Sequence, residues 1–419
     1  MKFFRKKPIL LGAAAGIFAV AGYYGFSFVP GETYNSEETA ANVAMNEVKK
    51  AEAEKPAEKP KNLPPPVTHL KTPEPLKAIY MTSCVAASVP WRNSLVELIE
   101  TTELNSLVID IKDYSGTISF TPETPILREN GGTGCRAGDM RKFLTELNAK
   151  GIYTIGRITV FQDPYYTSAY PELAVKKLSD GTVWKDYKGL SFVDVGSKPF
   201  WDYIVALAKE SYSIGFDEIN FDYIRFPSDG DMKDVDYRSL GGKTKAETLR
   251  EFFAYLFNQL KPEGAVLSVD LFGMTTTNAD DLNIGQVLEN TFPYFDYVSP
   301  MVYPSHYPPN FNGWSNPNKY IYEVVKYSMD KAVLRAESAM TQILLPGESR
   351  IGTTTPAMYT KPVYDRKKLR PWLQDFDYGG NYGAAEVRAQ IQATYDSGLT
   401  SWMLWDPGNK YTREALNAN

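Results

Sequence analysis

From Lys77 onward the sequence alternates between strand-like and helix-like runs, and this alternation restricts the chain to few folds. Eight short runs rich in aliphatic and aromatic residues are each followed by a run with helical apolar spacing. Repeated βα units predict a parallel sheet, and eight of them in about 340 residues predict a closed (β/α)8 TIM barrel. An open, doubly wound sheet is the alternative, but no glycine-rich phosphate turn follows the first strand. The strand-like runs are 77–85, 106–113, 152–161, 216–227, 265–273, 296–304, 370–376 and 401–407.

The N-terminal residues 1–29 differ from the rest in composition. A basic flank, MKFFRKK, precedes an uncharged apolar stretch that is about long enough to span a bilayer. We expect an uncleaved membrane anchor whose basic flank stays in the cytoplasm. The alternative is a signal peptide cleaved after Ala21, because Ala19 and Ala21 form a small-x-small site. Either interpretation places the remaining chain outside the cytoplasm. With an anchor it lies at the cell surface or in the periplasm, and after cleavage it is secreted.

Residues 30–75 are rich in Ala, Glu, Lys and Pro and contain few large apolar side chains. Such a segment cannot bury enough surface to fold, so it predicts a disordered, extended linker. The folded domain is therefore expected over 76–419. Nothing in its composition calls for an oligomer, and we expect a monomeric barrel.

Charge and histidine content exclude several classes of function. The net charge is −5 and the folded part has no Lys/Arg-rich block, which argues against a nucleic-acid partner. With His69 in the linker, His306 is the single histidine of the predicted barrel, so a zinc site with several His ligands is excluded. We predict no metal and no cofactor. Cys84 and Cys135 lack a CxxC spacing, and they could form a disulfide or remain two separate thiols.

The stretch FDEINFDYIRFP, residues 216–227, carries polar side chains two residues apart within an apolar strand. Side chains two apart share one face of a strand, so Glu218, Asn220 and Asp222 are expected to point the same way. Other predicted strands also end in polar residues, and strand ends form the active sites of TIM barrels. Acids at the ends of four strands suit catalysis, although a structural network neutralised by Lys112, Arg157 and Arg225 is the alternative.

Carboxyl groups, arginines and aromatic rings together favour glycoside hydrolysis. That reaction needs one protonated carboxyl group as an acid and one ionised carboxylate as a nucleophile or base. Aromatic rings such as Tyr303 and Trp405, at two strand ends, suit the flat faces of sugars. No nucleophile elbow of the G-x-S-x-G type is present.

Four motifs, within 156–177, 201–230, 267–273 and 297–307, closely resemble a bacterial family of predicted glycoside hydrolases with a (β/α)8 barrel. The resemblance extends from Lys77 to the C-terminus and implies the same fold and activity class. A weaker resemblance is to the fourth-strand motif of chitinases, but Ile224 occupies the place of the catalytic glutamate. This difference argues against chitinase chemistry. By resemblance to other sugar hydrolases with barrels, Asp222 is the expected nucleophile.

We therefore predict a glycoside hydrolase acting on a cell-envelope or extracellular polysaccharide or oligosaccharide. Asp222 would be the nucleophile or base and Asp270 the general acid. Glu218 lies deeper in its strand and is expected to act as an ion-pair partner. The alternatives are a non-catalytic carbohydrate-binding or cell-envelope scaffold, and a metal-dependent hydrolase or deacetylase. Asp113 and Asp406 are the alternatives to Asp270 as the second acid. The candidate substrate-binding residues are Asp110, Lys112, Asp113, Arg157, Glu218, Arg225, Tyr303, His306, Trp405 and Asp406.

Overall fold

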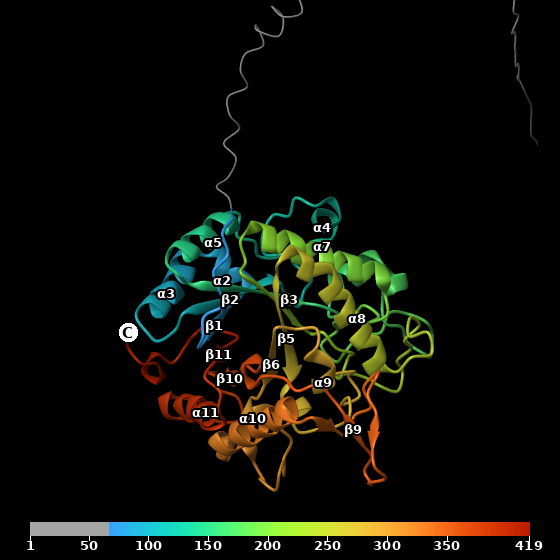
Figure 1. Cartoon of the computed structure of the whole chain (residues 1–419). Helices are drawn as coiled ribbons and strands as arrows, with labels where there is room; N and C mark the ends of the chain where they lie inside the picture. The colour runs from blue at the N-terminus through green and yellow to red at the C-terminus, as the bar shows by residue number, and fades with distance from the viewer. Residues whose placement is uncertain (1–66) are drawn as a thin grey trace, which may run out of the picture. The chain divides into compact units, whose positions relative to one another are not determined.

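A computed structural model of the chain describes residues 67–419, and eight parallel strands close into a barrel (Figure 1). The predicted (β/α)8 barrel is confirmed, and its strands fall in the eight expected runs. Around the barrel the strand order is β1-β11-β10-β6-β5-β4-β3-β2. The strands are β1 (Lys77–Met81), β2 (Ser106–Lys112), β3 (Tyr153–Thr159), β4 (Glu218–Asp222), β5 (Val266–Phe272), β6 (Tyr297–Met301), β10 (Trp372–Gln374) and β11 (Trp402–Trp405).

Helices surround the strands in Figure 1, although not every crossover has a long one. Between β5 and β6 the expected helix shrinks to the four residues of α9, and the expected terminal helix is a single 3-10 turn, η7 (Arg413–Ala415). The helices are α2 (Ser83–Ala87), α3 (Val89–Glu100), α4 (Pro125–Asn130), α5 (Met140–Ala149), α6 (Pro164–Ala169), α7 (Lys198–Ile214), α8 (Lys245–Leu260), α9 (Leu288–Thr291), α10 (Ile321–Glu337) and α11 (Ala384–Asp396).

Strand alternation divides the apolar side chains into two cores. On β1, Ala78 and Tyr80 belong to a cluster inside the barrel, whereas Ile79 and Met81 belong to the larger cluster between strands and helices. The inner cluster is small and aromatic-rich, because the polar side chains of several strands occupy the rest of the interior. Position 156 of β3 must be glycine, since an added Cβ would lie 2.1 Å from a carbon of Ile111.

The segment that precedes β1 lies against the N-terminal end of the barrel. The Leu70 amide donates to Asp217 at 2.7 Å, and Thr72 shares a hydrogen bond of 2.9 Å with the Tyr153 hydroxyl. His69 stacks on Tyr212 with ring centroids 3.9 Å apart. Residues 67–75, expected in the linker, therefore pack on the barrel because their backbone and side chains find partners there. The expected anchor (1–29) and the linker up to residue 66 lie outside the described residues.

The region from 335 to 368, which has no clear sequence pattern, contains a small antiparallel sheet. Its strands are β7 (Met340–Thr341), β8 (Arg350–Ile351) and β9 (Met358–Thr360), in the order β7-β9-β8. Within residues 67–419 no helix is both long and apolar enough to cross a membrane.

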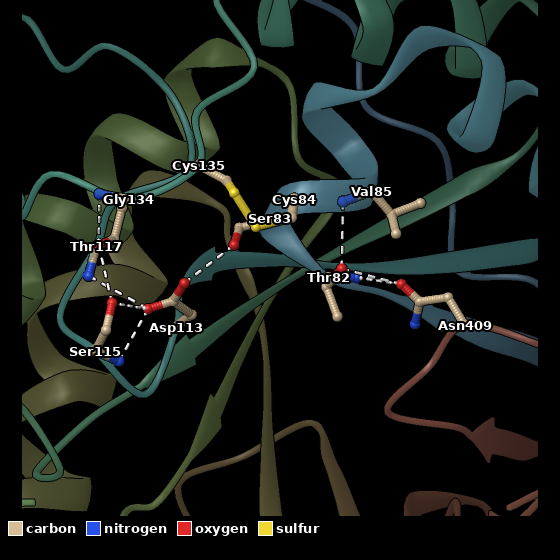
Figure 2. Close-up of a disulfide and its surroundings, with 10 residues drawn as sticks. All are labelled: Thr82, Ser83, Cys84, Val85, Asp113, Ser115, Thr117, Gly134, Cys135 and Asn409. Carbon is tan, nitrogen blue, oxygen red and sulfur yellow. Dashed lines mark hydrogen bonds between the residues drawn. A yellow bond between two sulfur atoms is a disulfide. The ribbon is translucent and has the colours of Figure 1, made fainter.

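Cys84 and Cys135 form a disulfide, which resolves the question that the sequence leaves open. Cys84 lies in α2 and Cys135 in the loop between α4 and α5, 51 positions later (Figure 2). The bond lies beside the loop that follows β2, where Asp113 accepts hydrogen bonds from Ser83 and Ser115. It therefore ties the helix α2, which follows β1, to the loop between α4 and α5, which follows β2.

Replacing both cysteines by serine is expected to lower the free energy of unfolding by about 2–4 kcal/mol, because the unfolded chain loses a long covalent loop. Denaturant unfolding of the double variant, beside the oxidised and the reduced wild type, measures this difference. The reduced wild type should match the double variant. Equal stability of all three would contradict a stabilising cross-link.

Candidate active site

One buried guanidinium group, that of Arg157 on β3, lies among three aspartates from neighbouring strands. In the barrel register Arg157 pairs with Asp110 of β2 on one side and with Asn220 of β4 on the other. Alternation then puts Asp222, two residues after Asn220, on the same inward face. Asp270 follows on β5. Four adjacent strands therefore direct their polar side chains to one level of the barrel interior.

Asp222 makes the closest contacts with Arg157. Its Oδ2 accepts hydrogen bonds from Nη2 and, at 3.1 Å, from Nε of Arg157. Its Oδ1 accepts from the backbone amide of Tyr223 at 2.5 Å. Tyr223 has a left-handed backbone, with φ of 46°, which ends the strand directly after Asp222. Because every donor favours the charged form, this arrangement stabilises the carboxylate of Asp222.

Asp270 has a different environment. Its Oδ1 accepts hydrogen bonds from Asn220 at 2.9 Å and from the Trp372 indole at 2.8 Å. Its Oδ2 lies 3.9 Å from Nε of Arg157, beyond hydrogen-bonding distance. Since Oδ2 of Asp222 lies 3.1 Å from the same Nε, the two oxygens are at most about 7 Å apart.

The third carboxyl group, Asp110, accepts from Nη1 of Arg157 at 2.7 Å and from the Tyr80 hydroxyl at 2.5 Å. The Tyr80 ring stacks on Trp405 with centroids 3.9 Å apart. The guanidinium carbon of Arg157 lies 5.0 Å from the Trp405 ring centroid, a cation–π distance. Trp405 and Tyr80 thus cover Arg157 with aromatic surface.

A single cation among three buried acids sets their protonation. Burial raises the pKa of Asp270, and the charge of Asp222 raises it further. Arg157 only partly opposes these two effects, so the pKa of Asp270 reaches about 8. Burial also raises the pKa of Asp110, against the opposing charge of Arg157, to about 6. Burial alone would lower the pKa of Arg157, but Asp222 and Asp110 raise it well above its ordinary value. Near neutral pH the site therefore keeps Asp270 protonated.

Asp222 and Asp270 line a cavity of about 240 Å³, here called the inner cavity. The wall of the inner cavity is largely apolar. Gly273 is part of this wall, and a Cβ added there would lie 2.4 Å from the Met301 carbonyl oxygen. The Tyr303 side chain lies on this wall, and its hydroxyl makes no hydrogen bond within residues 67–419. The lining residues that bear on function are Arg157, Asp222, Arg225, Asp270, Tyr303, His306, Trp372 and Trp405.

A second cavity of about 480 Å³, the outer cavity, shares part of this wall. Arg157, Tyr223, Arg225 and Trp405 line both cavities. The outer cavity is more polar and is also lined by Asp110 and by loop residues between 186 and 192. The four shared residues form the boundary between the two cavities, next to Asp222.

Of the predicted site residues, eight lie in these cavities. Both predicted catalytic aspartates, with Arg157, Arg225, Tyr303, His306 and Trp405, line the inner cavity, and Asp110 lines the outer one. Lys112, Asp113, Glu218 and Asp406 line neither.

Lys112 is turned away by an irregularity in the β2–β3 register between Asp110 and Lys112. Its ammonium group is fully buried, 2.9 Å from a carboxylate oxygen of Asp163, and donates to the Thr159 carbonyl at 2.6 Å. Asp113 accepts hydrogen bonds from Ser115 of its own loop and from Ser83 of α2. These contacts satisfy both side chains locally.

Glu218 and Asp406 also have local partners. At the N-terminal end of β4, Glu218 accepts from Arg370 at 2.5 Å and from the Tyr153 hydroxyl at 3.1 Å. This is an ion pair, as its depth in the strand suggested. Asp406 accepts from the Lys410 amide at 3.1 Å.

Sequence reasoning missed three residues that organise the site, namely Tyr80, Tyr223 and Trp372. A usable signal existed for Trp372, which lies two positions before Gln374 on the same face of β10. Tyr80 likewise shares the inward face of β1. The left-handed backbone of Tyr223 has no signal in the sequence, because a tyrosine rarely adopts it.

No group of three or more His, Cys, Asp or Glu side chains in the described part of the chain could hold a metal. The three aspartates surround a guanidinium group, which occupies the position where a shared cation would have to lie. The site chemistry available from these residues is acid–base and nucleophilic.

Comparison with known proteins places this site in context. A model of the family described as "Putative glycosyl hydrolase domain" matches residues 78–411. No curated protein matches the chain.

Among solved structures, the PgaB (BpsB) glycoside hydrolase domain from Bordetella bronchiseptica is similar at 12% identity, over 82% of this chain and 99% of that one, with a TM-score of 0.55. This likeness concerns the fold. A hypothetical protein from Ruminiclostridium thermocellum is 36% identical over 49% of this chain and 98% of its own, with a TM-score of 0.43.

The raised pKa of Asp270 predicts a pH-dependent stability. Between the pKa of an unfolded aspartate, about 4, and the folded value, about 8, the folded state binds more protons than the unfolded state. Wild-type stability relative to Asp270→Asn should therefore fall as pH rises from 5 to 8, by up to about 1.4 kcal/mol per pH unit. Denaturant unfolding of both proteins at several pH values measures this. A difference that is constant with pH would contradict the assignment.

Proposed function

Because this chain belongs to the family described as "Putative glycosyl hydrolase domain", we propose that it hydrolyses glycosidic bonds in a cell-envelope or extracellular polysaccharide. The observation that carries the proposal is the pairing of Asp222 and Asp270 in one cavity. Arg157 holds the first as a carboxylate, and burial beside that charge keeps the second protonated. Glycoside hydrolysis needs one carboxyl group in each state.

In the proposed reaction Asp270 donates its proton to the glycosidic oxygen as the bond to the anomeric carbon breaks. Asp222 attacks the anomeric carbon and forms a glycosyl ester. Asp270, now ionised, takes a proton from water, and the resulting hydroxide displaces Asp222 and releases the sugar. The bound of about 7 Å between the two carboxyl oxygens includes the separation of about 5–5.5 Å that this nucleophilic role requires.

The surrounding residues support the same role. Trp405 and Tyr303 offer aromatic faces to a sugar ring, and Trp372 fixes Asp270 through its indole N–H. Tyr303 has a free hydroxyl in a wall that it shares with both aspartates. The Arg157 guanidinium holds Asp222 in place by hydrogen bonds before it attacks, and at 3.9 Å from Asp270 it also stabilises that residue once it has lost its proton.

The proposal includes an extracytoplasmic location. The disulfide between Cys84 and Cys135 supports it, since disulfides persist in oxidising compartments.

Asp222→Asn and Asp270→Asn are each expected to lower hydrolysis at least about 100-fold, because each removes a group that takes part in the reaction. The measurement is reducing-end release by the full-length chain from a panel of bacterial and extracellular polysaccharides. Asp330→Asn, on the surface of α10, is the matched control and should retain activity.

Each reaction is repeated with a chelator, which should have no effect. Loss of activity with chelator would instead support a metal-dependent hydrolase. If the wild type binds a polymer without releasing any reducing ends, the protein is a carbohydrate-binding scaffold and the proposal fails.

The pH dependence of kcat/KM tests the role of Asp270 as acid. Since its carboxyl group must be protonated, activity should decline above about pH 8, where it loses its proton. A rate profile on the best substrate from the panel, between pH 5 and 10, measures this limb. Activity that rises through pH 8 would assign the acid role elsewhere.

A further inference from the structure

Arg225 is the arginine of the site that the proposed mechanism does not use. It lies three positions after Asp222 and lines both cavities at the place where they meet. A substrate that occupied both cavities would lie against the residues that they share, Arg225 among them.

The Arg225 side chain is held in a fixed position. Its guanidinium carbon lies 4.9 Å from the Tyr223 ring centroid and 5.1 Å from that of Phe272, both cation–π distances. One nitrogen, Nη1, donates to the Phe226 carbonyl and to the Ser228 hydroxyl, both at 3.1 Å. The other nitrogens make no hydrogen bond within residues 67–419, so part of the donor fork is available.

Arg225 also lacks a carboxylate partner, in contrast to Arg157. Arg157 has three aspartates around it. No ion pair to Arg225 occurs within residues 67–419, and burial lowers its pKa. Arg225 is partly exposed, on the walls of both cavities, and a bound anion would supply the counter-charge that its guanidinium group lacks.

The acidic residues near Arg225 do not supply this counter-charge. Asp222 accepts a hydrogen bond from Arg157. Oδ1 of Asp186 accepts hydrogen bonds from the backbone amides of Lys188 and Leu190 at 2.9 and 2.8 Å. Asp229 is exposed at the rim of the outer cavity. These charges act on Arg225 only from a distance, and together they disfavour a doubly charged ligand.

We propose that Arg225 binds the carboxylate of an acidic sugar, a uronic acid unit, at the junction of the two cavities. The proposal rests on the function proposed above and names its substrate class as an acidic polysaccharide. A planar carboxylate carries one negative charge and matches the guanidinium fork. Trp405 and Tyr223, which line both cavities, flank the same position.

The test measures the binding of monosaccharides to the full-length chain near pH 7. Binding is detected by tryptophan fluorescence or by calorimetry. Glucuronate should bind at least about tenfold more tightly than glucose or glucuronamide, its uncharged analogue, because a hydrogen bond to a charged group is worth that much. Glucose 6-phosphate, with nearly two charges, should bind less tightly than glucuronate.

Arg225→Gln should remove the preference for glucuronate, and Arg225→Lys should retain part of it. Arg350→Gln, on β8 and remote from both cavities, is the matched control and should behave as wild type. Thermal unfolding of each variant shows whether its fold is intact.

Equal binding of glucuronate and glucuronamide by the wild type, or no measurable binding of either, would overturn this inference. So would a preference that survives in a folded Arg225→Gln variant. Because binding needs no turnover, the outcome is independent of the hydrolysis assay. A protein that prefers glucuronate but cleaves no polymer would retain this inference while the proposed activity fails.

Discussion

The site depends on the placement of one guanidinium group among three carboxyl groups inside a closed barrel. In water three aspartates and an arginine would all ionise. In the barrel interior, where charges are poorly screened, one cation cannot balance three anions. The unbalanced charge is relieved by retaining protons, and the largest share falls on Asp270, which is the most weakly contacted by Arg157. Asp270 thereby keeps its proton near neutral pH, unlike an aspartate in water.

Barrel closure makes this arrangement possible. Parallel strands in register bring Asp110, Arg157 and Asn220 to one level, and alternation brings Asp222 beside them. The opposite end of the interior holds the Arg370–Glu218 ion pair, and the segment before β1 packs against that end. At that end one carboxylate, Glu218, faces one guanidinium group, that of Arg370, whereas at the C-terminal end three carboxyl groups surround Arg157. This imbalance of charge lies beside the inner and outer cavities.

Much of the barrel fold and of the candidate site could be predicted from the sequence. Eight strand-like runs gave the number of βα units, the two-residue period put Glu218, Asn220 and Asp222 on one face, and Asp270 was expected near them because it lies on the next predicted strand. What failed involved contacts between distant segments. Lys112 has the correct period, but the register irregularity turns it toward Asp163. The pairing of Cys84 with Cys135, the contact of Trp372 with Asp270 and the docking of residues 67–75 all join segments far apart in the chain. No local pattern encodes such contacts.

The account is tested most directly by observing the protonation of Asp270. Carbon-13 NMR of aspartate-labelled protein can follow its carboxyl carbon through a pH titration, with Asp270→Asn identifying the signal. The account predicts a midpoint near pH 8 in the wild type and a lower midpoint in Asp222→Asn, where the neighbouring negative charge is removed. A midpoint close to that of an ordinary aspartate, about 4, would contradict it.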